Sequence, residues 1–366
     1  MKALAITPGT TDIALIDRPE PTLSTATQIK AKVLQVGICG TDREEAAGGR
    51  ADAPSGSTQL VIGHEMFCQV VEVGAGVTSA KPGDYGVFMV RRPCGTCVAC
   101  ASRRSDMCMT GNYTERGIKG FDGFQQEFVV DEEAFFLTVP ADIRDLGVLA
   151  EPMSVGEKAI DEAVRIQDAR LPDVDPDSWL RGKRTLVVGL GPIGLLAVAI
   201  LRLRGAEVLG LDIVEEDSIR ARTLKAFGGQ YVDGRKVKTL DLDDTFGQID
   251  FIFEATGVAQ LEFDLIDALG INGIYVVTGI PAGDRPVTMQ PGSLMQQLVL
   301  KNQVVLGSVN ASYEHFRMAI EDLEAAKKQF PEAMANIITD RHAYTDFAAA
   351  LSHHGSDEIK CVLEWN

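Results

Sequence analysis

The sequence predicts an α/β fold that combines a β-rich domain with a doubly wound parallel sheet. Three observations indicate it. Short apolar runs separated by Gly, Pro and Asp fill the chain to about residue 152. Apolar strands then alternate with helical stretches from about 154 to 309, and a glycine-rich turn lies inside this second region. With 366 residues the chain is too long for one small core, and its length predicts two or three domains.

Periodicity and chain breakers place the individual elements. In the first region we expect strands at 29–36, 67–73, 85–90 and 124–130. In the second we expect strands at 185–188, 207–211, 249–253 and 274–278, with helices ending near 203 and 227. A polar stretch over 165–183, without sustained period, reads as a connector.

The last part of the chain is predicted to return to the first domain. A helix starts near 312, since Phe316, Ala319, Ile320 and Leu323 recur at helical spacing, and a strand at 359–365 suits the first domain's sheet. This arrangement reduces the domain count to two. The expected β-rich domain covers 1–153 and 311–366, and the expected dinucleotide domain covers 154–310.

Charge and composition exclude several functions. The chain carries 35 Lys and Arg against 52 Asp and Glu, a formal net charge of −17, which argues against binding nucleic acid or an anionic membrane. The longest uncharged stretch, 185–201, is broken by Gly and Pro, which disfavours a membrane span. The apolar run 3–6 is too short for the core of a signal peptide, so we expect a cytoplasmic protein.

The glycine-rich turn has the context that a dinucleotide site requires. Gly189-Leu190-Gly191-Pro192-Ile193-Gly194 follows an apolar strand and opens a helix. The first Gly allows the tight turn, the second lets the backbone approach a pyrophosphate, and the third lets helix and strand pack closely. The alternative is a turn of the same shape that binds nothing.

An acidic residue ends the next strand, about twenty positions further on. Asp212 can accept hydrogen bonds from a ribose diol, and it would repel a 2′-phosphate. The following residues 213–216 offer no Arg or Lys to neutralise it. We therefore expect NAD as the preferred cofactor, with NADP as the second one to test; the alternative is that Asp212 only caps a helix.

Four of the seven cysteines crowd into one loop. Cys94, Cys97, Cys100 and Cys108 have the spacing that closes a tetrahedron around one zinc, and they define a four-cysteine lobe at about 91–110. Four thiolates leave no open coordination position, so this metal would be structural. An iron–sulfur cluster or an unused remnant are the alternatives.

A second, mixed set of ligands is dispersed along the first domain. It comprises Cys39, the pair His64-Glu65, and Glu151. Each alone reads as an ordinary structural residue, but together one thiolate, one imidazole and carboxylates can hold zinc and leave a position open. An open zinc is a Lewis acid that stabilises an alkoxide, and an alkoxide carbon releases hydride to a nicotinamide ring.

These motifs carry a family resemblance over essentially the whole chain. GxCGTD, GHE, the four-cysteine lobe, an EP step and GxGxxG occur in the order seen in zinc-dependent medium-chain dehydrogenases of the alcohol dehydrogenase superfamily. More narrowly, the chain resembles the archaeal-type glucose 1-dehydrogenase branch. The segments concerned are 39–43, 91–94, 115–118, 122–124, 149–152, 157–158, 254–257 and 307–310.

The resemblance implies a GroES-like catalytic domain, a Rossmann domain, and roles for particular residues. Cys39, His64 and Glu65 would hold the catalytic zinc, with Glu151 at or near it, and Thr41 would bond the reacting hydroxyl. The sugar hydroxyls would be bound by Glu115, Glu151 and Asn310; for Glu115 the alternative is a solvated loop acid. Thr256, Gly279 and Asn310 would join the cofactor site, and a homodimer or homotetramer is expected.

The sequence departs from that branch at three positions. Members that accept NADP commonly have Asn or Gly and then Arg where this chain has Asp212 and Ile213. A sugar-contacting Asp of some members falls at Val155, which leaves the preferred aldose open. The proton-relaying His of many alcohol dehydrogenases is absent, and Glu44 lies in that region.

Three functions follow as hypotheses. The first is an NAD-preferring, zinc-dependent aldose 1-dehydrogenase that oxidises the anomeric hydroxyl to a lactone, with one catalytic and one structural zinc. The second is a medium-chain dehydrogenase for another polyol or a secondary alcohol. The third is a non-catalytic NAD-binding sensor or scaffold held by structural zinc alone.

Overall fold

The chain folds into two compact units. The computed structural model describes residues 1–172, 174–281, 286–352, 355 and 357–365. The first unit comprises Met1–Ser154, Asn310–Glu324 and Ile338–Asn366; the second comprises Val155–Val309 and Ala325–Ile337. The second unit thus takes in 325–337, which the sequence assigned to the first domain. Helix α10 (Pro331–Ala335) packs there on α5 (Ile219–Ala226), and the ring centroids of Phe227 and Phe330 lie 5.6 Å apart.

The first unit is built on β-sheets, as predicted. Its main sheet has the order β11 (Phe136–Thr138), β6 (Tyr85–Phe88), β5 (Glu65–Val73), β3 (Gln28–Ile38), β19 (Lys360–Glu364) and β18 (Ile338–Ala343), and β10 (Phe128–Glu132) also pairs with β3. Two smaller sheets have the orders β2 (Ile13–Asp17), β1 (Lys2–Ile6), β4 (Leu60–Val61), and β7 (Arg91–Arg92), β8 (Thr114–Arg116), β9 (Gly120–Phe121). Alternate strand residues such as Val33, Val70 and Phe88 form the core.

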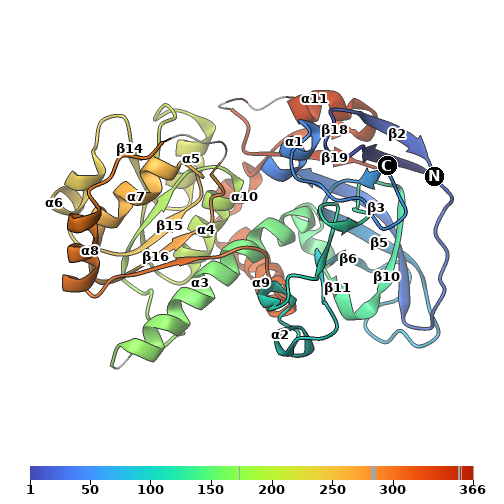
Figure 1. Cartoon of the computed structure of the whole chain (residues 1–366), viewed down its shortest axis with the longest axis horizontal. Coiled ribbons are helices and arrows are strands. Elements are labelled where there is room, and N and C mark those ends of the chain that lie inside the picture. The colour runs from blue at the N-terminus through green and yellow to red at the C-terminus, as the bar shows by residue number, and fades with distance from the viewer. Residues whose placement is uncertain (173, 282–285, 353–354, 356, 366) are drawn as a thin grey trace. The chain divides into compact units, whose positions relative to one another are not determined.

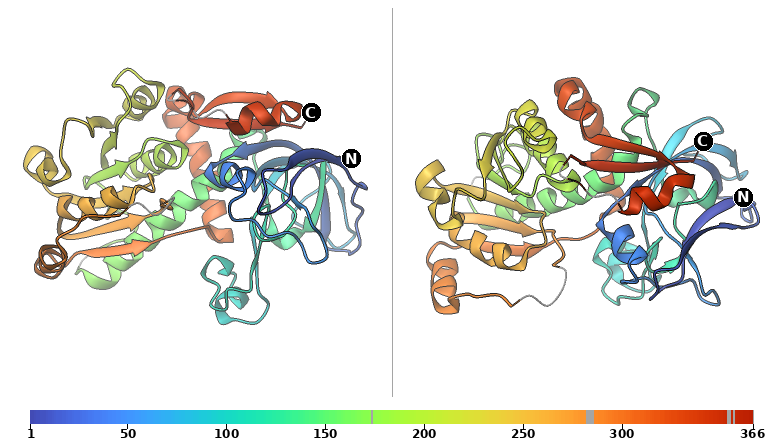
Figure 2. Two further views of the ribbon diagram at one scale, coloured as in Figure 1. Left: turned by 45° about the horizontal axis from the view of Figure 1, so that its top comes forward. Right: turned by 90° about the horizontal axis from the view of Figure 1, so that it is seen from above.

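The C-terminal strand returns to the first unit's sheet, which confirms that prediction. Strand β19 pairs antiparallel with β3, and Figure 2 shows the red end of the chain beside the blue strands. The helices of this part are α1 (Gly40–Ala46), α2 (Val98–Ala101), α3 (Ala150–Arg170), α9 (Tyr313–Gln329) and α11 (Phe347–Ser352). Helices α3 and α9 each continue into the second unit.

Two sequence-based element predictions were wrong in part. The expected strand 124–130 begins only at Phe128, because the backbone N–H groups of Gly123 and Phe124 bond the carbonyls of Val61 and Gly63 instead of a ladder partner. The expected connector from 165 is helical up to Arg170, since α3 continues. Arg165 pairs with Asp161 one turn earlier at 2.7 Å, which stabilises this helix where no apolar period shows.

The second unit is a parallel sheet with helices packed against it (Figure 1). The strand order is β14 (Gln230–Asp233), β13 (Glu207–Asp212), β12 (Arg184–Val188), β15 (Ile249–Glu254), β16 (Leu269–Val277) and β17 (Val304–Gly307). Its helices include α4 (Pro192–Leu203), α5, α6 (Leu242–Phe246), α7 (Ala259–Ala268), α8 (Pro291–Leu300) and α10, together with most of α3. Numbered within the unit, the order is 3-2-1-4-5-6, the doubly wound arrangement of dinucleotide-binding sheets.

No helix in the described part of the chain is both long enough and apolar enough to cross a membrane.

Candidate active site

Cys39 is held by the start of a helix. It lies directly after β3 as the N-cap of α1, with an extended backbone. Its Sγ accepts the N–H of Thr41 at 3.2 Å, and its own N–H donates to Asp42 Oδ2 at 2.8 Å. This reciprocal capping determines where the sulfur points.

His64, directly before β5, and Glu65, its first residue, approach the same sulfur. Gly63 precedes them with a φ of +89°, a left-handed conformation that glycine adopts without strain. His64 Nε2 lies 3.1 Å from Cys39 Sγ, and its Nδ1 lies 3.7 Å from Asp42 Oδ1. One ligand atom each from Cys39, His64 and Glu65 lies within 4.8 Å of the others. The structure therefore brings these three predicted ligands together.

Negative charge gathers around His64. Burial by itself disfavours the imidazolium, but the Cys39 thiolate and the Asp42 carboxylate raise the pKa of His64 well above its usual value. Asp42 was not predicted as part of the site. The sequence did contain a sign of this role, because an acidic residue three positions after the helix-capping Cys39 can close a capping box.

A buried lysine also reaches this cluster. Lys360 on β19 is 1% exposed; it forms an ion pair with Glu65 and donates to the carbonyl of Ile38 at 3.0 Å. A Cβ on Gly37 would lie 2.0 Å from Glu65 Oε2, so only glycine leaves room for this carboxylate. Nothing in the sequence pointed to Lys360, because sheet pairing alone brings it beside β3.

Glu151 and Thr41 complete the expected set. Glu151 is buried in the first turn of α3 and is not among the three ligands that lie within 4.8 Å of one another. Burial, reinforced by Glu65 and opposed by His64, raises the pKa of Glu151 to about 7. Thr41 is half-buried, and its hydroxyl has no hydrogen-bond partner among the described residues.

Two of the predicted sugar ligands bond each other. Asn310 Nδ2 donates to Glu115 Oε1 at 2.9 Å. The buried Arg91 donates to the same oxygen from Nε at 3.0 Å and from Nη2 at 2.8 Å. Glu115 is 9% exposed, so it is not the solvated loop acid that the sequence left open. Arg91 was quoted only as part of a motif and was missed as a neighbour of this carboxylate.

The glycine-rich turn has the predicted geometry. Gly189 has a φ of +88°, and a Cβ on Gly194 would lie 1.8 Å from the Gly189 carbonyl oxygen. A Cβ on Gly191 would meet no protein atom within 4 Å. Asp212, at the end of β13, accepts the N–H groups of Leu190 at 2.7 Å and Ile213 at 2.6 Å, which ties the acid to the turn. Pro192 and Ile193 open α4.

A fully buried glutamate accepts hydrogen bonds from Thr256 and Gly279, two of the expected cofactor contacts. Glu254 ends β15; its Oε1 accepts the N–H and hydroxyl of Thr256 and the N–H of Gly257, and its Oε2 accepts the N–H of Gly279 at 3.2 Å. Glu254 was missed as a positioning residue. Its place at the carboxyl end of a parallel strand, where such sheets bind ligands, was the available signal.

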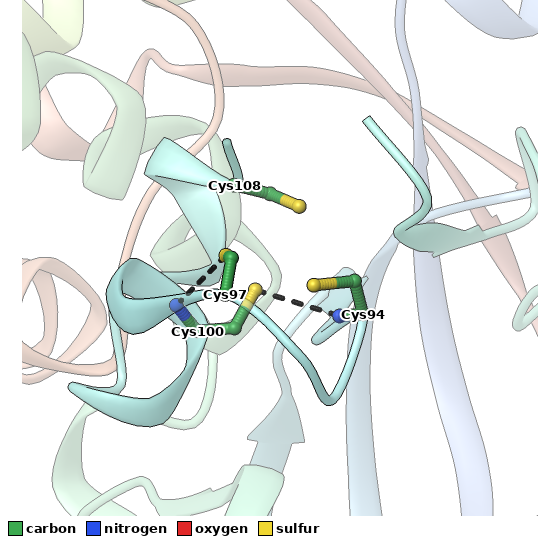
Figure 3. A group of neighbouring side chains, drawn as sticks. All are labelled: Cys94, Cys97, Cys100 and Cys108. Atoms are coloured by element: carbon green, nitrogen blue, oxygen red, sulfur yellow. Dashed lines mark hydrogen bonds between the residues drawn. The ribbon is translucent and has the colours of Figure 1, made fainter. Parts of the chain in front are cut away.

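The four cysteines of the lobe converge as predicted (Figure 3). Their ligand atoms lie within 4.8 Å of one another. Hydrogen bonds from Thr110 and Thr96 lower the pKa of Cys94 to about 5, and a bond from Thr110 lowers the pKa of Cys108, whereas burial raises the pKa of Cys100 to about 12. Thiolates are the form that binds metal, so the set suits zinc. All seven cysteines are free, and the buried Cys68 and Cys361 lie outside both clusters.

Comparison with known families assigns the chain. A model described as "Alcohol dehydrogenase GroES-like domain" matches residues 25–141, and one described as "Glucose dehydrogenase C-terminus" matches residues 144–365. A GroES-like domain joined to a parallel dinucleotide-type sheet defines the medium-chain class of dehydrogenases. Within that class, the chain belongs to the glucose dehydrogenase family.

The similarity to individual relatives extends over nearly the full length of both chains. The chain is 38% identical to glucose 1-dehydrogenase 2 of Vulcanisaeta moutnovskia and 36% identical to glucose 1-dehydrogenase of Methanocella arvoryzae, covering 100% of this chain and 99% of each relative. It superposes with a TM-score of 0.89 on Haloferax mediterranei glucose dehydrogenase in complex with NADP, Zn and gluconolactone, at 31% identity over 100% of this chain and 99% of that one.

Proposed function

We propose that this protein is a zinc-dependent aldose 1-dehydrogenase that oxidises the anomeric hydroxyl of a glucose-like sugar to the lactone and transfers the hydride to NAD. The observation that carries the proposal is the convergence of Cys39, His64 and Glu65, an incomplete ligand set that leaves room for substrate. The relatives named glucose 1-dehydrogenase, and the zinc, NADP and gluconolactone in the Haloferax structure, support it.

The proposed roles in the first unit follow from side-chain chemistry. Cys39, His64 and Glu65 would hold the catalytic zinc, with Glu151 at or near it. When bound, this zinc supplies Lewis-acid stabilisation of negative charge on the reacting oxygen. The hydroxyl of Thr41, which has no hydrogen-bond partner among the described residues, would accept a hydrogen bond from the reacting hydroxyl. Glu115, Glu151 and Asn310 would bind the remaining sugar hydroxyls, since carboxylates and amides hold vicinal hydroxyls by paired hydrogen bonds.

The second unit would bind the cofactor. The N–H groups at the start of α4, behind the turn of 189–194, would hold the pyrophosphate. Thr256 and Gly279 of this unit would also contact the cofactor, whereas Asn310, the third expected contact, belongs to the first unit. The free thiols suit a reducing compartment, so we propose the cytoplasm as the place of action.

Initial rates on aldoses, alditols and simple alcohols, each with NAD and NADP, test this function. We expect the highest kcat/KM for an aldose, with glucose, galactose and xylose compared because Val155 offers no polar group to a ring hydroxyl. If the best substrate lacks an anomeric hydroxyl, the chain is instead a polyol or secondary-alcohol dehydrogenase.

Metal content distinguishes the enzyme from a non-catalytic NAD sensor. We expect about two zinc ions per chain, because the chain has two separate ligand clusters. The ion at Cys39, His64 and Glu65 should leave first on titration with a chelator, since its site is open. Elemental analysis with protein quantification measures both. A ratio near one would support the sensor.

NAD rather than NADP is the proposed physiological cofactor, in contrast to the NADP of the Haloferax structure. Asp212 would face the ribose, and its negative charge disfavours a 2′-phosphate. The structure adds a cation that the sequence did not suggest. Arg235, just beyond β14, forms ion pairs with Glu215 and with Asp233, the register neighbour of Asp212, so its charge is already neutralised.

Replacement of Asp212 should change the cofactor preference. In Asp212→Ala we expect the ratio of kcat/KM for NAD to that for NADP to fall about 10- to 100-fold, since about two charge-assisted hydrogen bonds to the ribose are lost. Glu215→Gln, which releases one partner of Arg235, should mainly improve kcat/KM for NADP. Steady-state kinetics with both cofactors measures these ratios. An unchanged ratio in Asp212→Ala would remove this residue from the ribose site.

A homodimer or homotetramer is the proposed assembly. Helix α8 exposes the apolar side chains of Met295, Val299 and Leu300, and the edge strand β17 exposes Val305. An unpaired strand edge beside exposed apolar residues favours pairing with a second copy. Light scattering of the holoenzyme measures its molecular mass, which should be two or four times the mass of one chain.

A further inference from the structure

The carboxylate of Glu115 is fixed from one side only. Its Oε1 accepts three hydrogen bonds, two from Arg91 and one from Asn310, at 2.8 to 3.0 Å. Within the part of the chain that the structure describes, no donor is hydrogen-bonded to Oε2. Three bonds on one oxygen hold the plane of the carboxylate and leave the other oxygen as an acceptor for a ligand hydroxyl.

Arg91 is itself fixed by the four-cysteine lobe. It is 5% exposed and stands opposite Glu115 in the pairing of β7 with β8. Its Nη1 donates to the carbonyl of Asp106 at 2.9 Å, and its guanidinium carbon lies 3.8 Å from the centroid of the Tyr113 ring. A planar fork stacked on a ring and bonded at three nitrogens has little freedom to rotate.

Asp106 belongs to the lobe's own framework. It lies in the short 3-10 helix Ser105–Met107, directly before Cys108, and its carboxylate accepts from Arg104 Nη2 at 2.8 Å. Cys108 N–H donates to the carbonyl of Ser105 at 3.2 Å. A metal held by the four cysteines would therefore determine where the Asp106 carbonyl lies. The connection runs from Cys108 to the Ser105 carbonyl, along the backbone to Asp106, and then through Arg91 to Glu115.

We propose that Arg91 is a positioning residue through which the four-cysteine lobe orients the Glu115 carboxylate, so that the lobe determines affinity for the sugar without taking part in hydride transfer. This inference rests on the proposed function, because it takes Glu115 as a sugar ligand. It assigns to the lobe an effect on substrate binding in addition to structural stability.

Kinetics of Arg91→Lys in the zinc-loaded holoenzyme test the proposal. Lysine keeps the charge but cannot bond Glu115 and Asp106 at once while stacking on Tyr113. We expect KM for the aldose to rise about 10- to 50-fold, as loss of one or two charge-assisted bonds implies. We expect kcat to stay within about threefold, and zinc content and the Kd for NAD to stay unchanged.

Arg92→Lys is the matched control. Arg92 is the next residue on β7, is 8% exposed, and pairs with Asp131 instead of Glu115. Its replacement should lower the melting temperature with little effect on KM. Equal KM increases in the two variants, or an unchanged KM in Arg91→Lys, would overturn the proposal. A wild-type enzyme without aldose activity would overturn the proposed function and this inference together.

A double-mutant cycle tests the link to the lobe. In Cys97→Ser, which removes one lobe ligand, KM for the aldose should rise by a similar factor. The double variant Arg91→Lys with Cys97→Ser should show little further increase, because both changes interrupt the same series of contacts. Multiplicative effects would contradict the link. If Cys97→Ser does not fold, Arg91→Lys and Arg92→Lys still decide the role of Arg91.

Discussion

Cys39→Ser should reduce kcat on the best aldose by on the order of 10³-fold or more, because polarisation of a substrate oxygen by a metal contributes several kcal/mol to the barrier. The fold should survive, since serine is also a good N-cap for α1. The Kd for NAD should stay unchanged, because the proposed cofactor site lies on the second unit. Stopped assays over hours, NAD titration and zinc analysis measure the three quantities.

Cys68→Ser is the matched control for this substitution. Cys68 is fully buried, its Sγ donates to the carbonyl of Gly86 at 3.2 Å, and it belongs to neither ligand cluster. The same chemical change there should leave kcat and zinc content near wild type. Full activity of Cys39→Ser would refute the proposed catalytic zinc site, whatever the control shows.

Alanine at two glycines of the dinucleotide turn should abolish tight cofactor binding for different reasons. The Cβ of Gly194→Ala would lie 1.8 Å from the Gly189 carbonyl oxygen, so the turn itself must move. We expect the free energy of unfolding to fall by about 1–3 kcal/mol and NAD affinity to be lost with it. The Cβ of Gly191→Ala meets no protein atom, so the fold should keep its stability. The Kd for NAD should still rise about 100-fold, because the Cβ takes the place of the pyrophosphate.

Fluorescence titration with NADH and thermal unfolding of the free enzyme separate the two effects. Gly292→Ala is the control, since a Cβ on this glycine near the start of α8 would also meet no atom within 4 Å. That variant should match the wild type in both measurements. Wild-type NAD affinity in Gly191→Ala would contradict the proposed position of the pyrophosphate.

Much of the fold could be predicted because its signals are local. Three signals can each be read within a short window of sequence. They are the alternation of strands and helices, the glycines that allow the tight turn, and the spacing of the four cysteines. The prediction failed at 124–127, where backbone groups bond a distant loop, and at 165–170, where Gln167 and Arg170 of α3 donate to the distant carbonyl of Asn272. Local pattern cannot show either effect, because the partners that decide them come from folding.

The sequence by itself determined the class of protein, two domains in outline, and the residues proposed for two metal sites and a dinucleotide turn. Only the tertiary structure decided which distant side chains stand beside them. Lys360 reaches Glu65 through the pairing of β19 with β3, and Arg91 reaches Glu115 through β7 and β8. The physical reason is that spacing along the chain determines local conformation. Buried charged residues that are far apart in the sequence come into contact only when strand pairing brings their strands together.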